Sequence, residues 1–154
     1  MKSVVDETDR NNISTGNAGE YFVAGELERK GFTCAVPMSN TKDFDILAIG
    51  RRTNNQYAIQ VKTTRGKKKE WTLSEKNETL IADNIIYVFV TLNEQDYPEY
   101  HIVPSKIVAE KIKEDHKEWS EKLGRNGVPH NSKFSMRKFR DLNDEYRNNW
   151  GLLK

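Results

Sequence analysis

Cysteine is nearly absent from this sequence, because Cys34 is the only one among 154 residues. A lone cysteine excludes an intrachain disulfide and a cysteine zinc cluster. Long hydrophobic runs are missing too, since the longest, residues 85–90, has six residues against the ~18 that span a bilayer. The start of the chain also lacks the apolar core of a signal peptide. These absences predict a soluble, cytoplasmic protein in a reducing compartment, with no membrane partner.

An excess of charge of one sign is also missing. Lysine and arginine number 25 and aspartate and glutamate 23, which gives a net charge of +2. That balance excludes a strongly basic protein that coats nucleic acid and an acidic, solvating tail protein. A length of 154 residues with 10% aromatics indicates one folded domain of about 150 residues. We expect residues 1–13 to form a flexible N-terminus and residues 14–154 a single domain.

Hydrophobic periodicity predicts helices towards both ends of the chain and strands between them. The first helix spans about residues 15–30, with Asn17 and Glu20 at capping-box spacing and Gly31 as its C-cap. Strands are expected at residues 32–36, 44–49, 57–64, 71–73, 85–92 and 100–103, with residues 51–55 as a hairpin turn. A helix over residues 105–123 and a last helical stripe follow, the stripe being Phe139, Leu142, Tyr146 and Trp150. This order predicts an α/β or α+β domain whose mixed sheet is covered by helices.

Four polar side chains break the pattern of the elements that carry them, and such breaks tend to mark function. Glu20 shares the core-facing side of the first helix, and Asp45 interrupts an apolar strand. Gln60 and Lys62 lie on one face of another strand, where an amide and an ammonium are costly unless an anion or a metal meets them. Structural explanations stay open for each: a capping carboxylate, an aspartate at a strand end, and an edge strand with a solvated face.

The predicted hairpin decides whether these side chains converge. A loop of residues 51–54 lets Asp45 oppose Gln60 and puts Lys62 on the same face. In this register Leu47 opposes Ala58, Ile49 opposes Gln56, Phe44 opposes Val61 and Ile46 opposes Ile59. A shift by two residues opposes Asp45 and Lys62 directly and makes the same cluster, whereas a β-bulge would break the pairing. Hard oxygen ligands suit Mg²⁺, which acidifies a bound water, and a nearby lysine can neutralise charge on a phosphate.

On these residues the sequence resembles the PD-(D/E)XK nuclease superfamily, whose fold is restriction-endonuclease-like. The resemblance covers about residues 15–64 and rests on three segments: Gly-Glu-Tyr-Phe-Val-Ala-Gly-Glu-Leu from Gly19, Asp-Phe-Asp-Ile-Leu from Asp43, and Gln-Val-Lys-Thr-Thr from Gln60. A helix glutamate, an aspartate and then Gln-x-Lys is similar to the subset that includes archaeal Holliday-junction resolvases and modification-dependent restriction nucleases. The resemblance implies an α-β-β-β-α-β core with a mixed central sheet flanked by helices, followed by a C-terminal helical extension.

The resemblance also implies a role for each site residue. Asp45 corresponds to the metal-binding aspartate, Gln60 to the acidic position, Lys62 to the catalytic lysine and Glu20 to a helix acid, with the backbone carbonyl of Val61 as a further metal ligand. The implied cofactor is Mg²⁺ or Mn²⁺. Two positions depart from the pattern: Phe44 replaces the nominal proline, and the neutral amide of Gln60 replaces an acid, which should weaken metal binding.

Positive charge is concentrated in one segment. Residues 51–69 carry +7 and contain no acidic residue, while the rest of the chain carries −5. The loop that follows the Lys62 strand lies at the same end of the sheet as Asp45, so we expect its cations to contact DNA phosphates. These cations are Arg65, Lys67, Lys68 and Lys69; a solvated lysine loop is the alternative. Arg51 and Arg52 lie at the hairpin end, ~20 Å away at ~3.3 Å per residue.

Three functions are therefore considered. The first is a metal-dependent endonuclease that hydrolyses phosphodiester bonds of DNA by attack of an activated water. The second is a catalytically inactive nucleic-acid-binding domain of the same fold, and the third is a protein-interaction module. DNA is the expected partner, and a homodimer is possible because many nucleases of this kind pair to cut two strands.

Overall fold

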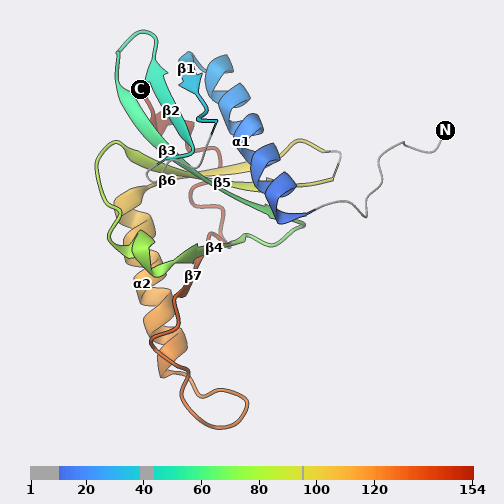
Figure 1. The fold of residues 1–154 in the computed structure, drawn as a ribbon, viewed down its shortest axis with the longest axis vertical. Helices are drawn as coiled ribbons and strands as arrows, with labels where there is room; N and C mark the ends of the chain where they lie inside the picture. Colours follow the sequence, from blue (N-terminus) through green and yellow to red (C-terminus); the bar gives the residue numbers. More distant parts are fainter. Residues whose placement is uncertain (1–10, 39–43, 95) are drawn as a thin grey trace, which may run out of the picture.

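A mixed five-stranded sheet forms the centre of the protein (Figure 1). The computed structural model describes residues 11–38, 44–94 and 96–154. Across the sheet the strands are β1 (Phe32–Ala35), β2 (Ile46–Gly50), β3 (Gln56–Arg65), β5 (Ile85–Leu92) and β6 (Glu99–Pro104). Neighbouring strands are antiparallel except for β3 and β5, which run parallel in the middle of the sheet. The mixed sheet that the sequence predicts is confirmed.

The two parallel strands make the most buried part of the sheet. β5 is built almost entirely of β-branched and aromatic residues, and Ile86 to Leu92 are buried whichever face they point to. β5 pairs with β3 from Ala58 opposite Ile85 to Arg65 opposite Leu92. Parallel strands are normally covered on both faces, and this is the case here, as the sequence predicts.

Each face of the sheet carries its own hydrophobic layer. The covering elements are α1 (Asn12–Arg29), β4 (Glu70–Ser74), the 3₁₀ helix η2 (Glu75–Glu78), α2 (Ser105–Glu121), β7 (Met136–Arg140) and the 3₁₀ helix η3 (Trp150–Leu152). α1 packs Val23 and Leu27 against one face. α2 and a small sheet of β4 and β7 cover the other, where the rings of Phe89 and Phe139 stack with centroids 4.3 Å apart. Within the described residues no helix is long and apolar enough to cross a membrane.

The ends of α1 follow from its capping residues. Asn11 accepts a backbone N–H of the first turn at 2.8 Å, so the helix begins earlier than the sequence predicts. The predicted capping box of Asn17 and Glu20 is therefore wrong, because both residues lie inside the helix. Gly31 follows the last turn with φ of 99°, in the left-handed region that favours glycine, and confirms the predicted C-cap.

The predicted C-terminal helical extension is wrong. Phe139 lies in β7, where it pairs with β4, and the residues after β7 form turns and η3. The Asp141 carboxylate explains these turns, because it accepts the N–H groups of Glu145 and Tyr146 at 2.9 and 3.0 Å and bonds to the buried His101 ring at 2.6 Å. A side chain that takes up backbone amides in this way competes with a helix.

The connection between the two parallel strands also differs from the predicted core order. The α-β-β-β-α-β order places an α-helix between the third strand and its parallel neighbour. In the structure β4 and η2 fill that connection, and α2 follows β6 instead. Glu70 of β4 pairs with Arg140 of β7, so the partner strand is distant in sequence and local periodicity could not indicate it.

A glycine lets α1 lie directly against β3. A Cβ atom at Gly19 would stand 1.8 Å from Oγ1 of Thr63, so a larger residue cannot fit without moving the helix. Nearby, the Nε–H of Arg65 donates to Oγ1 of Thr15 at 2.7 Å and ties the end of β3 to the first turn of α1. These contacts set the distance between helix and sheet, and with it the position of Glu20.

Gly19→Ala should lower the free energy of unfolding by ~1–3 kcal/mol, because the added methyl group over-packs the contact with Thr63. Gly25→Ala on the same helix is the control, since a Cβ there meets nothing within 4 Å and the exchange should stabilise the helix by ~0.5–1 kcal/mol. Urea denaturation measures both. An unfolding free energy for Gly19→Ala at or above that of the wild type would contradict the close approach.

Candidate active site

The β2–β3 hairpin has the predicted register. Leu47 pairs with Ala58 and Ile49 with Gln56 in the antiparallel ladder. The N–H of Gly50 donates to the carbonyl of Asn55 at 2.9 Å and closes the turn over residues 51–54. The hydrophobic alternation of the two strands and the short loop are both local, which is why the sequence could specify this pairing.

Asp45 lies where β2 separates from β3. Its own N–H donates to the carbonyl of Ile59 at 2.9 Å, although Ile59 is already the ladder partner of Ile46. Two residues of one strand facing one residue of the other is the arrangement of a β-bulge. The Asp45 carboxylate then accepts the N–H of Val61 at 2.7 Å. The predicted pairs of Asp45 with Gln60 and of Phe44 with Val61 are therefore wrong, because the bulge ends the ladder at Ile46. The Asp45 carboxylate instead meets β3 between Gln60 and Lys62.

The backbone of Val61 adds an oxygen at the same edge of the strand. The N–H and C=O groups of one strand residue point to the same side. Because the Val61 N–H points to Asp45, the Val61 carbonyl lies on the edge from which β2 departs. The carboxylate of Asp45 and this carbonyl therefore lie along one edge of β3.

Gln60 and Lys62 share one face of β3, as predicted, and this face points away from α1. In the parallel ladder they stand beside Tyr87 and Phe89, which belong to the layer under α2. Gln60 is buried, with 8% of its surface exposed, and Lys62 is half-buried. The interpretation of this strand as a solvated edge does not hold, because β3 is central in the sheet.

Glu20 approaches the same place from α1. It is half-buried, and its pKa is raised mainly by burial and further by the negative charge of Asp45, while the positive charge of Lys62 lowers it. Charges shift a pKa in this way only when they lie close together. Glu20 on α1 therefore lies near enough to Asp45 and Lys62 for their charges to act on its carboxylate.

Tyr87 and Asn77 are neighbours of this cluster that the sequence did not reveal. Tyr87 stands beside Gln60 in the ladder, and the buried Asn77 of η2 donates to its hydroxyl at 2.8 Å. Burial raises the pKa of Tyr87, the hydrogen bond from Asn77 lowers it, and the charge of Asp45 raises it. An asparagine in a 3₁₀ helix gives no periodic signal, so only the tertiary contact identifies the pair.

The basic loop after β3, which carries Arg65, Lys67, Lys68 and Lys69, makes more contacts with the rest of the fold than the sequence suggests. Arg65 is bonded to Thr15, and Lys69 forms an ion pair of 2.5 Å with Asp144. Lys67 and Lys68 are exposed at the tip of the loop. Of the four predicted phosphate contacts, two are therefore occupied in holding the fold, and two project into solvent.

The donor set of the cluster fits Mg²⁺ or Mn²⁺ better than a softer metal. Among the residues that the structure describes, no group of three or more histidine, cysteine, aspartate or glutamate side chains gathers to hold a metal. The predicted ligands are two carboxylates, Glu20 and Asp45, with the amide of Gln60 and the carbonyl of Val61 as neutral oxygens. Mg²⁺ is commonly held by one or two carboxylates, with waters and substrate phosphates as its other ligands. Asp43, the first residue of the aspartate segment, lies outside the described residues.

Comparison with solved structures identifies the fold. A bacterial homing endonuclease, I-Ssp6803I, superposes with a TM-score of 0.52 at 12% sequence identity, over 92% of this chain and 90% of that one. The Holliday junction resolvase Hjc of Archaeoglobus fulgidus superposes with a TM-score of 0.47 at 16% identity, over 82% of this chain and 84% of that one. No protein-family model and no curated protein matches the sequence. The chain has the restriction-endonuclease-like fold of the PD-(D/E)XK nucleases, as the sequence predicts.

Glu20→Gln should raise the melting temperature at neutral pH, because the raised pKa of Glu20 means that the folded state disfavours the ionised carboxylate. The gain should shrink as the pH falls through the folded-state pKa of Glu20, where the wild-type side chain also becomes neutral. Thermal melts of both proteins across the acidic range measure the difference. Glu26→Gln is the control on the same helix: Glu26 pairs with Arg29 and Lys30, so its loss should not stabilise. An equal gain in both variants would contradict a specific cost at Glu20.

Proposed function

We propose that this protein is a divalent-metal-dependent endonuclease that hydrolyses phosphodiester bonds of DNA by attack of an activated water. The observation that carries the proposal is the Asp45 carboxylate, bonded to the Val61 N–H where β2 leaves β3 and electrostatically coupled to Glu20. A nuclease fold supports the proposal. The proposal includes a cytoplasmic location. A homodimer, with one active site for each strand of a duplex, is a further prediction.

The metal ligands in this proposal are the carboxylates of Glu20 and Asp45, the amide oxygen of Gln60 and the backbone carbonyl of Val61. When bound, Mg²⁺ or Mn²⁺ lowers the pKa of a coordinated water and polarises the scissile phosphate. Asp45 is held in place by the Val61 N–H, so its carboxylate needs little reorganisation to act as a ligand. Because ligands must be deprotonated to bind a metal, the raised pKa of Glu20 makes binding weaker in acid.

Lys62 supplies the positive charge of the site. A lysine ammonium next to the scissile phosphate stabilises the negative charge that develops on its oxygens in the transition state. The ammonium can also hold the attacking water by a hydrogen bond. Lys67 and Lys68 are the exposed cations for phosphates that flank the site, and such contacts give affinity without sequence specificity.

Lys62→Met and Asp45→Asn should each reduce DNA cleavage by ~10²-fold or more, because each removes a charge that acts on the reacting phosphate or its metal. Both exchanges keep the shape of the side chain, and asparagine can still accept the Val61 N–H. The assay is cleavage of circular and linear duplex DNA with Mg²⁺ or Mn²⁺. Lys113→Met, at an exposed position of α2, is the control and should cleave as the wild type does.

Cleavage that survives both exchanges would remove these residues from the site. Salt-sensitive DNA binding without cleavage under any divalent ion would favour the catalytically inactive DNA-binding domain instead. No DNA binding even at low salt would favour the protein-interaction module.

Gln60→Glu should lower the Mg²⁺ concentration for half-maximal cleavage by about tenfold, because a third carboxylate adds ligand charge. Titration of cleavage against Mg²⁺ measures the shift. Gln56→Glu is the matched control, on the same strand and face but exposed at the hairpin end. If both variants shift the titration equally, the amide of Gln60 is not a metal ligand.

A further inference from the structure

An aromatic groove lies between α1 and the segments around Tyr97 and Trp150, outside the candidate active site. Its volume is about 640 Å³, within the range of ~300–1,000 Å³ typical of ligand sites. Three of its aromatic side chains are exposed, namely Tyr21 at 69%, Phe22 at 48% and Tyr97 at 91%. Tyr100 and Trp150 line the groove more deeply. Exposed aromatics gathered in this way are costly in water, which points to a ligand with apolar faces.

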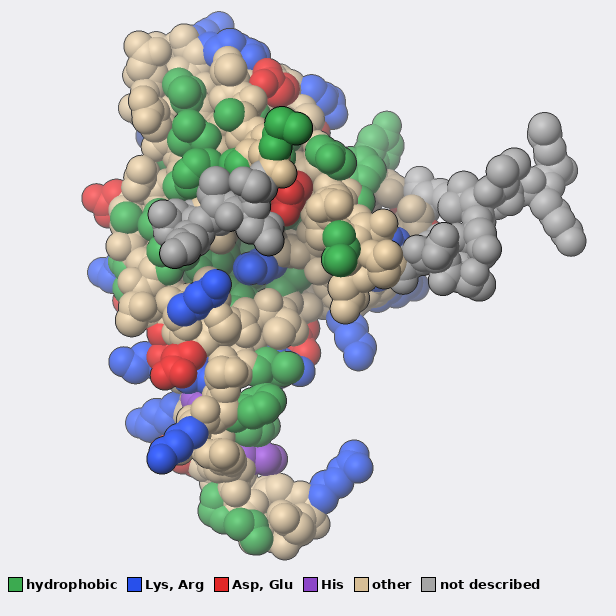
Figure 2. All heavy atoms as spheres, in the orientation of Figure 1, with side chains coloured by type: hydrophobic (Ala, Val, Ile, Leu, Met, Phe, Trp, Pro, Cys, Tyr) green, Lys and Arg blue, Asp and Glu red, His purple; other side chains and the backbone are tan. Residues whose placement is uncertain are grey.

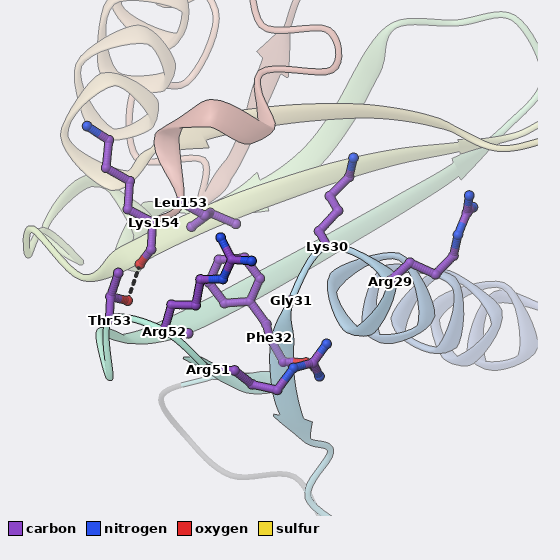
Figure 3. A pocket seen from close by; sticks show the side chains of 10 residues that line it. Arg29, Lys30, Gly31, Phe32, Arg51, Arg52, Thr53, Leu153 and Lys154 are labelled. Atoms are coloured by element: carbon purple, nitrogen blue, oxygen red, sulfur yellow. Dashed lines mark hydrogen bonds between the residues drawn. The ribbon is translucent and has the colours of Figure 1, made fainter.

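A cationic pocket adjoins this groove at the C-terminal end of α1. Figure 3 shows its lining, with Arg52 from the hairpin and Lys30, just after α1, pointing to the same side. The pocket has a volume of about 560 Å³. Its basic side chains are Arg29, Lys30, Arg51, Arg52 and Lys154. Figure 2 shows lysine and arginine side chains gathered at this end of the molecule, where α1 and the β2–β3 hairpin end.

The charge of the pocket is only partly compensated. Glu26 pairs with both Arg29 and Lys30, and Glu28 pairs with Arg51, which also caps the last turn of α1. Arg52 is exposed and makes no ion pair among the described residues. The pocket therefore keeps a surplus of positive charge that suits an anion such as a phosphate.

Groove and pocket form one continuous surface, because Arg29 and Lys30 line both. Lys30 also lies over the ring of Trp150, with Nζ 5.3 Å from the ring centroid. The surface starts beside the candidate active site, since Tyr21 follows Glu20 directly in α1. From Tyr21 to Lys30 it extends ~14 Å along the helix at ~1.5 Å per residue.

We infer that this surface, the α1 path, binds an unpaired strand of nucleic acid, whose bases stack on the aromatic side chains and whose phosphates meet the cations. Aromatic faces combined with a basic groove are the means by which proteins hold single strands. Bases inside a duplex are stacked on each other and offer no such faces. Under the proposed function, the substrate class is DNA with an unpaired strand next to the cleaved bond, such as a flap, fork or junction.

A second copy of this chain fits the path less well. A symmetric dimer places the same patch on both partners, which would bring two sets of these cations face to face, and like charges across an interface oppose association. A polyanion complements the surplus charge instead. Self-association is therefore an outcome that the test below must separate from nucleic-acid binding.

The test measures binding of a fluorescent oligodeoxythymidine of ~12 nucleotides by fluorescence anisotropy. EDTA is present, so that the measurement depends neither on a metal ion nor on cleavage. The double variant Phe22→Ala/Tyr97→Ala should bind about tenfold or more weakly, because each stacked base is lost with its aromatic partner. Phe134→Ala is the matched control, since Phe134 is exposed to the same 48% as Phe22 but lies outside the path. Arg52→Ala should also reduce the salt dependence of binding, by a slope of about 0.7 on a log–log plot.

Four results would overturn the inference: no binding of the oligonucleotide by the wild type, unchanged affinity of the double variant, an equal loss for a duplex of the same length, or a loss that follows dissociation of a dimer in sedimentation. The test is separate from that of the proposed function. Stacking-dependent binding by a protein that never cleaves would refute the nuclease and keep the α1 path. Cleavage that depends on Lys62, with no stacking-dependent binding, would do the reverse.

Discussion

The parallel ladder between β3 and β5 is the interaction on which the rest of the structure depends. It runs from Ala58 opposite Ile85 to Arg65 opposite Leu92, and its apolar residues supply both hydrophobic layers. β3 carries Gln60, Val61 and Lys62 along a strand that is held by backbone hydrogen bonds on its β5 side. The β5 side of β3 is fully paired. β2 can therefore separate only from the opposite edge of β3, and this is the edge at which the candidate active site lies.

The separation itself depends on the Asp45 carboxylate. A strand that leaves a sheet normally exposes an unpaired N–H, which is costly when buried. Here the carboxylate accepts the Val61 N–H, so the side chain that would bind a metal also completes the backbone hydrogen bonding. Gly19 brings α1 close to β3, and burial, followed by the negative charge of Asp45, raises the pKa of Glu20 on that helix. The positive charge of Lys62 lowers the same pKa.

Much of the fold could be predicted from local sequence, and particular residues show why. The hairpin register follows from alternation on both sides of a short turn, and the structure confirms it for Leu47 with Ala58 and Ile49 with Gln56. The prediction of a last helix was wrong because Phe139 pairs with β4, a strand far upstream in the sequence. In addition, Asp141 accepts backbone N–H groups that a helix would need for its own hydrogen bonds. The bulge at Asp45 depends on a side-chain bond to Val61, which no periodicity reveals.

The sequence by itself determined which residues are proposed to do chemistry: a helix acid, a strand aspartate, and an amide and a lysine on one strand face. It also indicated the segment of concentrated positive charge. Tertiary structure decided which of these cations make contacts within the fold and which are exposed. Arg65 bonds to Thr15 and Lys69 pairs with Asp144, whereas the hairpin arginines lie beside the end of α1 and line one pocket with it. The physical reason is range: strand alternation and tight turns are set by neighbours in sequence, whereas a pocket is made where distant segments pack together.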